Sequence, residues 1–508
     1  MKLALTPLLA ALTCQAVSAF PNLEPSALRP RASNPSILID PPGFPPLPSA
    51  QQAAFQSAVV GLNLSNIQGD ILIGMRKKKE LFFFFSIDNP TAFKSRLGSD
   101  ILPLITRTTQ ILPNATHPPA TAVNIAFSQR GLNVLGIRDD LNDTNFKNGQ
   151  MYNVTATLGD QTSYWEPAFA GHHIHGVFLV ASDTIDKVKA TLSRIQKISK
   201  GSISEVYRIQ GHARPGNEQG HEHFGFLDGV SNPAVSGFAV AVPGQATVDP
   251  GIILLGESGD TGTRPDWAKD GSFLAFRQLQ QRVPEFNKFL VDNALSEPGL
   301  NASENAELLG ARMVGRWKSG APIDLTPLKD DPVLAVDHNR NNDFNFTHPD
   351  DPNFDFKTNQ SYCPFSAHIR KTNPRADIAN PFNQHIIRAG IPYGPEVTDA
   401  ENASNSSSTD PSLERGLAFV SYQSNIGQGF AFLQQVWANN KNEYLYFALR
   451  IGEDPIIGVA LDGERFASGL DPKNQTRNIT FNEDFVVSRG GEYFFSPSIS
   501  AIQNTLSV

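Results

Sequence analysis

The segment Ile174-His175-Gly176-Val177-Phe178-Leu179-Val180-Ala181 is an apolar run of strand length, and Ser182 and Asp183 follow it directly. Either of these two polar residues can cap a following helix. That helix would carry one apolar face, made of Ile185, Val188, Leu192 and Ile195. The segment therefore predicts a strand that leads into an amphipathic helix, which is the basic unit of an α+β fold.

The same order of strand and helix occurs on both sides of this segment. Upstream, residues 81–85 and 124–127 are apolar strand candidates, and a short helical period with Leu132 and Leu135 follows the second of them. Downstream, residues 417–422 precede a helical period that ends at Trp437. This echo predicts an internal duplication of an α+β unit, with a linker near residues 240–250, where Pro and Gly gather.

The N-terminus predicts processing and export. Lys2 precedes an apolar run that ends at Leu12, and small side chains at residues 16–19 suit cleavage, so residues 1–19 read as a secretory signal peptide. The run is shorter than the roughly 20 residues that span a bilayer. Residues 20–60 are rich in Pro, Ser and Ala without an apolar period, which predicts a propeptide or flexible arm. The predicted domains are then residues 61–240 and 241–508.

Composition narrows the class of protein. The chain has 508 residues, 40% of them hydrophobic, and a formal net charge of −8. These values exclude disorder along the whole length and argue against nucleic acid or an anionic membrane as partner. Loss of the signal peptide removes Cys14 and leaves only Cys363, so the secreted chain can form no intrachain disulfide. Asn-X-Ser/Thr sequons fit a secreted glycoprotein and begin at Asn63, Asn114, Asn142, Asn153, Asn301, Asn345, Asn359, Asn402, Asn405, Asn474 and Asn478.

Three segments carry candidate chemistry. Asp228 lies in the turn sequence 221–229, His368 follows the rigid Pro364, and Arg388 lies among aliphatic residues. Taken singly, the first two fit a turn aspartate and a core histidine. An arginine in apolar surroundings needs an anionic partner, because an unpaired buried charge is costly. Taken together, the three supply an iron ligand, a proton acceptor and a charge stabiliser.

The sequence Gly225-Phe226-Leu227-Asp228-Gly229 resembles the Gly-X-X-Asp-Gly motif of the fungal dye-decolorizing peroxidases. The resemblance extends from Gln68-Gly69-Asp70 to residues 490–497 and so covers nearly all of the predicted mature chain. It implies two ferredoxin-like domains, with antiparallel sheets and peripheral helices, that hold one haem b. It also implies a secreted enzyme that reduces hydrogen peroxide and oxidises bulky aromatic donors such as dyes, phenolics and lignin-related compounds.

The resemblance also implies residue roles. Asp228 would be the distal acid-base residue, Arg388 the distal arginine, and His368 the iron ligand with Asp454 as its carboxylate partner. Further implied roles are pocket walls for Leu417 and Phe419, haem propionate partners for Arg312 and Arg316, and surface electron transfer from bulky donors for Tyr393 and Trp437. Because an aspartate keeps its acceptor form in acid where a histidine does not, an acidic pH optimum is predicted.

Two other classes of function stay open at this point. The histidines of residues 172–175, together with His221 and His223, could converge on a strand face to bind zinc or copper in a metal-dependent hydrolase or a copper oxidase. Their spacing does not match His-Glu-X-X-His. The sequons and loop-rich composition also fit a non-catalytic, secreted glycan-binding protein. A visible spectrum separates these classes, since only a haem protein shows a Soret band.

Overall fold

The computed structural model describes residues 36–508 except 172, 379–382, 443–449 and 462. The predicted signal peptide 1–19 with Cys14, the first part of the predicted propeptide, and His172 lie outside the described residues. Ser36 to Val508 form one compact unit. No helix in this described part is long and apolar enough to cross a membrane.

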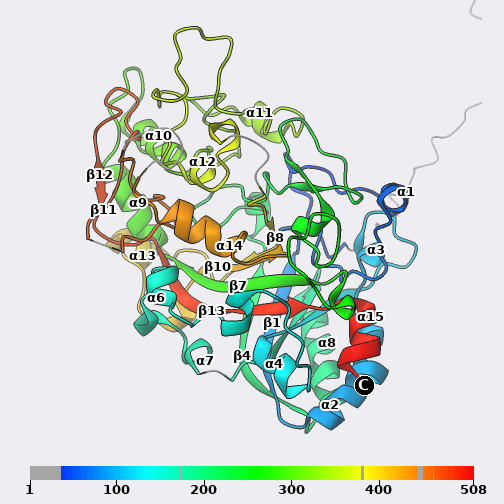
Figure 1. The fold of residues 1–508 in the computed structure, drawn as a ribbon. Coiled ribbons are helices and arrows are strands. Elements are labelled where there is room, and N and C mark those ends of the chain that lie inside the picture. Colours follow the sequence, from blue (N-terminus) through cyan, green and yellow to red (C-terminus); the bar gives the residue numbers. More distant parts are fainter. Residues whose placement is uncertain (1–35, 172, 379–382, 443–449, 462) are drawn as a thin grey trace, which may run out of the picture. The chain divides into compact units, whose positions relative to one another are not determined.

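An antiparallel sheet that closes on itself is the centre of the unit (Figure 1). Its strand order is β7-β13-β2-β3-β1-β4-β9-β10-β8, and β7 also pairs with β10, which completes a barrel. The strands are β1 (Lys79–Ile87), β2 (Thr121–Phe127), β3 (Gly176–Ser182), β4 (Ile203–His212), β7 (Ser272–Gln281), β8 (Ile387–Arg388), β9 (Ile391–Tyr393), β10 (Gly416–Gln423) and β13 (Val486–Ser496). Two small sheets pair β5 (Ala234–Val235) with β6 (Thr247–Val248) and β11 (Arg465–Ala467) with β12 (Ile479–Phe481).

The barrel consists of two ferredoxin-like halves. The first half has the strand order β4-β1-β3-β2. The second half has the equivalent order β13-β7-β10-β9. The halves meet where Phe127 pairs with Phe495 and where Gly211 pairs with Tyr393. The predicted α+β fold with internal duplication is confirmed. The boundary between residues 240 and 241 stays a prediction, because both halves share one barrel.

Most predicted elements are present, with shifted ends. The helix after β3 is α8 (Ile185–Ile198), whose buried face includes Val188, Leu192 and Ile195. Thr184 caps it, rather than Ser182 or Asp183. The late helix is α14 (Phe430–Phe432), which continues as a π-helix over Leu433–Ala438. The other helices are α1 (Ala50–Val60), α2 (Pro90–Arg96), α3 (Thr108–Ile111), α4 (Gln129–Val134), α5 (Thr144–Asn148), α6 (Val154–Thr157), α7 (Pro167–Ala170), α9 (Val283–Asp292), α10 (Ala302–Val314), α11 (Pro332–Val336), α12 (His368–Thr372), α13 (Asp399–Ser404) and α15 (Ile499–Ala501).

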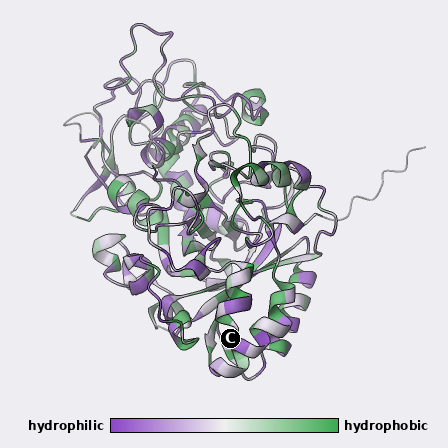
Figure 2. Ribbon diagram, turned by 45° about the vertical axis from the view of Figure 1, so that its right-hand side comes forward, coloured by the Kyte–Doolittle hydropathy of each residue, from purple (hydrophilic) through white to green (hydrophobic). Residues whose placement is uncertain are grey.

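The phenylalanine run of β1 explains how the barrel is filled. Phe84 packs on Phe276 with ring centroids 4.9 Å apart, whereas its neighbour Phe85 packs on Phe93 at 5.7 Å. Successive side chains of a strand point to opposite faces. Both faces of β1 are therefore buried, and the strand reads as a continuous apolar run. The outer helices instead have a hydrophobic and a hydrophilic side, as Figure 2 shows.

A second core lies around α9 and α10 and includes Phe286, Leu309 and Cys363. Cys363 is a free, fully buried cysteine, and burial raises the pKa of its thiol to about 12. Such a thiol packs as a small apolar side chain. This second core supports α12, which begins at His368 and packs Ile369 against it.

The segment Ser36–Val60 corrects one prediction. Ile39 N donates to Arg76 O, and the Phe44 ring packs on Leu227 and Val230. The segment includes helix α1 and is not a flexible arm, because its apolar side chains find buried positions on the main unit. Its removal as a propeptide stays a prediction.

Candidate active site

His368 and Asp454 form a fixed pair. His368 Nδ1 lies 2.7 Å from Asp454 Oδ2. The Asp454 side chain is 0% exposed, and its Oδ1 accepts backbone hydrogen bonds from Ile456 at 2.8 Å and Ile457 at 3.1 Å. The turn at residues 454–457 thus holds the carboxylate, and the carboxylate sets the orientation of the imidazole ring.

Electrostatics strengthen this pair. Burial opposes the charged form of each group, but their mutual attraction outweighs it, so that the pKa of His368 is raised and the pKa of Asp454 is lowered. The His368 side chain is 24% exposed and lines a cavity. Because Nδ1 is engaged by Asp454, Nε2 is the ring nitrogen that is left for a metal ion.

Asp228 and Arg388 form a second pair. Arg388 Nη1 donates to Asp228 Oδ1, and the two side chains are 25% and 21% exposed. Asp228 lies in a tight turn in which Gly229 has a φ of 121°. A Cβ atom on Gly229 would lie 2.6 Å from the ring of Phe44, so the last residue of the Gly-X-X-Asp-Gly motif has room only for glycine.

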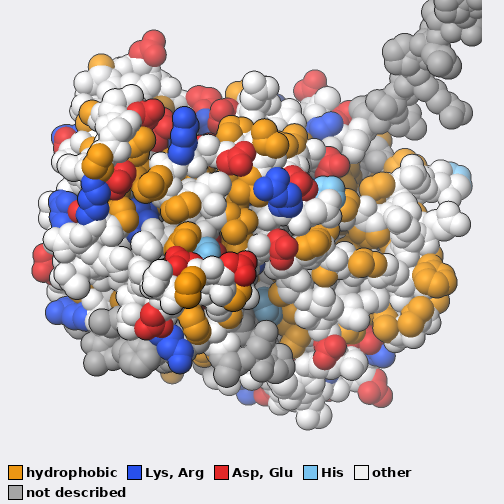
Figure 3. Space-filling view, turned by 90° about the horizontal axis from the view of Figure 1, so that it is seen from above, with side chains coloured by type: hydrophobic (Ala, Val, Ile, Leu, Met, Phe, Trp, Pro, Cys, Tyr) orange, Lys and Arg blue, Asp and Glu red, His pale blue; other side chains and the backbone are white. Residues whose placement is uncertain are grey.

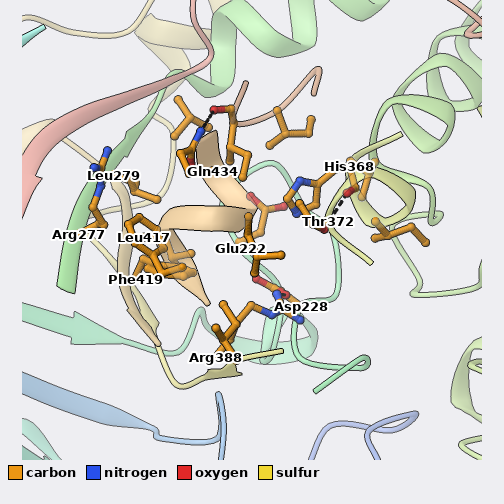
Figure 4. Close-up of a pocket in the computed structure, with 18 of the residues that line it drawn as sticks. Glu222, Asp228, Arg277, Leu279, His368, Thr372, Arg388, Leu417, Phe419 and Gln434 are labelled. Atoms are coloured by element: carbon orange, nitrogen blue, oxygen red, sulfur yellow. Dashed lines mark hydrogen bonds and ion pairs between the residues drawn. The ribbon is translucent and has the colours of Figure 1, made fainter. Parts of the chain in front are cut away.

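One cavity brings the two pairs together. His368, Asp228 and Arg388 line it with Leu417 and Phe419, and Figure 4 shows these two apolar side chains on the wall beside the ion pair. Leu417 and Phe419 share one face of β10, as their spacing predicts. Besides Asp454, the charge of Arg388 lowers the pKa of His368 and the charge of Asp228 raises it, each to a smaller extent.

Cationic side chains gather in the same cavity. Burial, together with the charges of Arg375 and Arg388, lowers the pKa of Arg316 to about 9. Arg316 donates to Ser231 Oγ and Asn342 Oδ1 at 3.0 Å each and to two backbone carbonyl oxygens. None of these described partners is a carboxylate. A bound anionic group would therefore be stabilised here, as the propionates of a haem would require.

Arg312 does not take the predicted role. It is fully buried away from the cavity and donates to five backbone carbonyl oxygens, those of Gln360, Ser361, Tyr362, Gly469 and Leu470. Helix α10 ends between Arg312 and Arg316, where Gly315 adopts a left-handed conformation with φ 95°. The chain turns there, so the two arginines face different surroundings, and the prediction for Arg312 as a propionate partner is wrong.

The predicted surface positions of Tyr393 and Trp437 are also wrong. Their exposed fractions are 7% and 2%. Tyr393 donates its hydroxyl to Glu414 Oε1 at 2.7 Å, and Trp437 packs on Phe432 with ring centroids 5.2 Å apart. Both elements turn these aromatic faces inward, and neither residue lines the cavity. A role in electron transfer stays a prediction.

Arg375 and Glu222 are among the cavity residues that were not predicted from the sequence. Arg375 follows Pro374 and begins a short 3-10 helix, Arg375–Asp377, where no periodicity marks it as functional. Glu222 accepts hydrogen bonds from the backbone of Phe224 and Phe226 at 2.9 Å each, and burial raises its pKa. In the sequence, Glu222 lies between His221 and His223, and this pattern indicates metal-binding histidines rather than a buried carboxylate.

The histidine clusters do not form a metal site in the described part of the chain. His175 Nδ1 accepts from the backbone of Ile87, and His223 Nε2 lies 2.8 Å from Tyr393 O. Across residues 36–508 as described, no three His, Cys, Asp or Glu side chains are placed to hold a metal ion. His172 lies outside this part.

Known proteins share both the sequence and the fold. Residues 66–215 match the DyP dimeric alpha+beta barrel domain, and residues 220–451 match the Dyp-type peroxidase C-terminal family. A dye-decolorizing peroxidase of Mycetinis scorodonius is 61% identical over 508 residues, covering 97% of this chain and 96% of its own. The chain belongs to the dye-decolorizing peroxidase family. It is therefore a haem-dependent peroxidase.

Solved dye-decolorizing peroxidases agree with this assignment. The crystal structure of a fungal DyP-type peroxidase from Auricularia auricula-judae has 52% identity and a TM-score of 0.84, and covers 88% of this chain and 99% of that one. A dye-decolorizing peroxidase with an engineered haem pocket has 51% identity and the same TM-score of 0.84, covering 88% of this chain and 100% of that chain. The hydrolase, copper oxidase and glycan-binding alternatives are set aside by this family membership.

Proposed function

We propose that this dye-decolorizing peroxidase binds one haem b through His368 and reduces hydrogen peroxide at the Asp228–Arg388 pair. The observation that carries the proposal is that His368, Asp228 and Arg388 line one cavity, with Asp454 buried behind His368. The donor set suits a haem, with an open His368 Nε2 for the iron and Arg316 and Arg375 for the propionates. When bound, the haem would supply the two electrons that break the O–O bond of the peroxide, and the aromatic donors would return them.

Asp228 is suited to the proton transfer. Its Oδ1 is engaged by Arg388, whereas its Oδ2 accepts no hydrogen bond from the described residues. Oδ2 can take a proton from one peroxide oxygen and return it to the departing oxygen. Negative charge grows on that departing oxygen, and the Arg388 guanidinium would lower the barrier by about 3 kcal/mol if it acts like other oxyanion donors.

His368 acts from the other pair. The Asp454 carboxylate accepts a hydrogen bond from His368 Nδ1, which makes Nε2 a stronger electron-pair donor to a metal ion. Leu417 and Phe419 keep the wall of the cavity apolar and limit the size of molecules that enter. Donors such as dyes, phenolics and lignin-related compounds would then need a path for electrons through the protein, and Tyr393 and Trp437 are the candidates.

We also propose secretion and glycosylation, with residues 1–19 as signal peptide and residues 20–60 as propeptide. Ten of the eleven sequon asparagines are exposed, and Asn359 is half-buried. Basic and acidic side chains are interspersed on the face that Figure 3 shows, without a broad basic patch. This surface supports small aromatic donors, rather than nucleic acid or an anionic membrane, as partners.

Optical spectroscopy tests the haem and its chemistry together. The protein purified from a haem-replete host should show a Soret band, and its pyridine haemochrome should have the spectrum of haem b. Addition of hydrogen peroxide should change the Soret band, and an aromatic donor should restore it. A folded protein without a Soret band would contradict the proposal.

A further inference from the structure

We propose that Asn232 is a positioning residue for the catalytic pair, because its side-chain amide fixes the backbone of Arg388. Asn232 lies four residues after Asp228 in the same loop and lines the same cavity. Arg388 N donates to Asn232 Oδ1 at 3.0 Å, and Asn232 Nδ2 donates to Arg388 O at 2.9 Å. The loop of Asp228 and the strand of Arg388 are thus joined by two hydrogen bonds.

The sheet topology explains why Arg388 needs this contact. Strand β8 contains only Ile387 and Arg388, and β10 is its one neighbouring strand in the described sheet. Ala389 N donates to Val420 O, on the β10 side. In a strand, the N–H and C=O of one residue point to the same side, and those of its neighbour point to the other side. The backbone of Arg388 therefore points away from β10, and Asn232 takes the place of a further strand.

The contact also links the two catalytic side chains. Asn232 is itself held, because Gln245 Nε2 donates to Asn232 O at 2.8 Å. On the other side of Arg388, Lys77 Nζ donates to Ala389 O at 2.6 Å. With its backbone fixed on both sides, Arg388 presents its guanidinium to Asp228 with little freedom. A displacement of about 1 Å at a catalytic group can cost up to roughly 100-fold in rate, so this restraint bears directly on peroxide reduction.

The inference rests on the proposed role of Arg388, and a double-mutant cycle tests the positioning role of Asn232 separately from that role. Asn232→Ala should lower kcat/KM for hydrogen peroxide by about tenfold. The KM for a small aromatic donor and the haem content should not change. In an Arg388→Ala background, Asn232→Ala should have no further effect, since a positioning residue acts only through the side chain that it positions. Losses that multiply in the double variant would overturn the inference.

Gln68 provides a matched control. Its amide makes the same two contacts with a backbone residue, since Ile125 N donates to Gln68 Oε1 and Gln68 Nε2 donates to Ile125 O, at 2.8 Å each. Gln68 does not line the cavity. Gln68→Ala should lower the melting temperature without a change in kcat/KM for peroxide. An equal kinetic loss in Gln68→Ala would show a general effect on folding and would overturn the inference.

Two further measurements keep the test decisive. Asn232→Asp keeps the acceptor for Arg388 N but places an anionic oxygen against Arg388 O, so an intermediate loss is expected even if Asn232→Ala folds poorly. A crystal structure of either variant should show the Arg388 guanidinium displaced from Asp228. An unchanged Arg388–Asp228 contact would overturn the inference whatever the kinetics of Arg388→Ala show about the proposed function.

Discussion

The His368–Asp454 pair and the Arg388–Asp228 pair each join one carboxylate to one basic side chain, but they are built differently. Asp454 is 0% exposed and accepts three hydrogen bonds, one from His368 and two from the backbone. Asp228 is 21% exposed and, among the described residues, accepts a side-chain hydrogen bond from Arg388 alone. A group that orients a metal ligand must be held in place and shielded from solvent, whereas a group that exchanges a proton with peroxide must be accessible to the peroxide.

The groups behind each pair differ in the same way. Behind His368, Lys371 Nζ donates to the backbone carbonyl oxygens of Trp437 and Gly452. Behind Arg388, Lys77 lies between Asp70 at 2.5 Å and Glu80 at 3.1 Å and also donates to Ala389 O. The support of the first pair is mainly backbone, whereas the support of the second is a buried cluster of charged side chains.

The largest expected effect is on the His368 side. His368→Ala removes the proposed iron ligand, so the purified protein should lack nearly all bound haem and all peroxidase activity. Haem content is measured from the Soret absorbance per chain. His348→Ala is a matched control, because His348 Nε2 also pairs with an aspartate, Asp324, at 2.9 Å, but does not line the cavity. Full haem content in His368→Ala would break the proposed division between the two pairs.

The next effect is on the Asp228 side. Asp228→Asn keeps the shape of the side chain but removes the proton acceptor, so the variant should retain haem and lose about 100-fold to 10,000-fold in kcat/KM for peroxide. Steady-state kinetics at fixed donor concentration measure this loss. Asp40→Asn is the control, because Asp40 also pairs with an arginine, Arg76, but its side chain is 80% exposed. Loss of haem from Asp228→Asn would show that the distal pair also holds the cofactor.

The pH dependence of stability should distinguish the charged cluster behind Arg388 from the backbone contacts behind His368. Burial raises the pKa of Glu80 to about 8. The attraction of Lys77 opposes this increase, and repulsion by Asp70 adds to it. Between its ordinary value near 4.5 and about pH 8, folded Glu80 binds a proton that the unfolded chain has lost, so its contribution to stability is full in acid and declines as the pH rises.

Glu80→Gln should therefore gain in stability relative to the unsubstituted protein, by a few kcal/mol, as the pH rises from 5 to 8. Thermal unfolding of both proteins across this range measures the difference, and the difference cancels the contributions of other titrating groups. Melting temperatures that change in parallel would contradict a protonated Glu80 behind Arg388.

The smallest expected effects on turnover come from substitutions of two buried aromatic residues, Tyr393 and Trp437. Tyr393 lies on β9, which follows the Arg388 strand in the chain and pairs with the same strand, β10. The backbone oxygen of Trp437 accepts a hydrogen bond from Lys371, three residues after His368. If they carry electrons, Tyr393→Phe and Trp437→Phe should each lower turnover of a bulky dye several-fold and leave turnover of a small phenol unchanged. Trp165→Phe, another buried tryptophan, is the control. Equal retention of both activities would leave these residues a packing role only.

The sequence predicted what local pattern and motif determine. The strands around Phe83, Phe127 and Phe178 follow from unbroken apolar runs, and Asp228 follows from its glycine-flanked motif. Closure of the barrel does not follow, since it depends on pairings such as Phe127 with Phe495 that are remote in sequence. Arg312 and Arg316 look equivalent in the chain, and only the helix end between them separates their roles.

Rapid mixing with hydrogen peroxide tests the division of labour between the two pairs most directly. The rate of the peroxide-dependent Soret change is compared in the unsubstituted protein and in Asp228→Asn, at equal haem content. We expect a full initial Soret band in both and a change that is at least about 100-fold slower in the variant. An equal rate in the two proteins would contradict the account, because peroxide would then react without the carboxylate of Asp228.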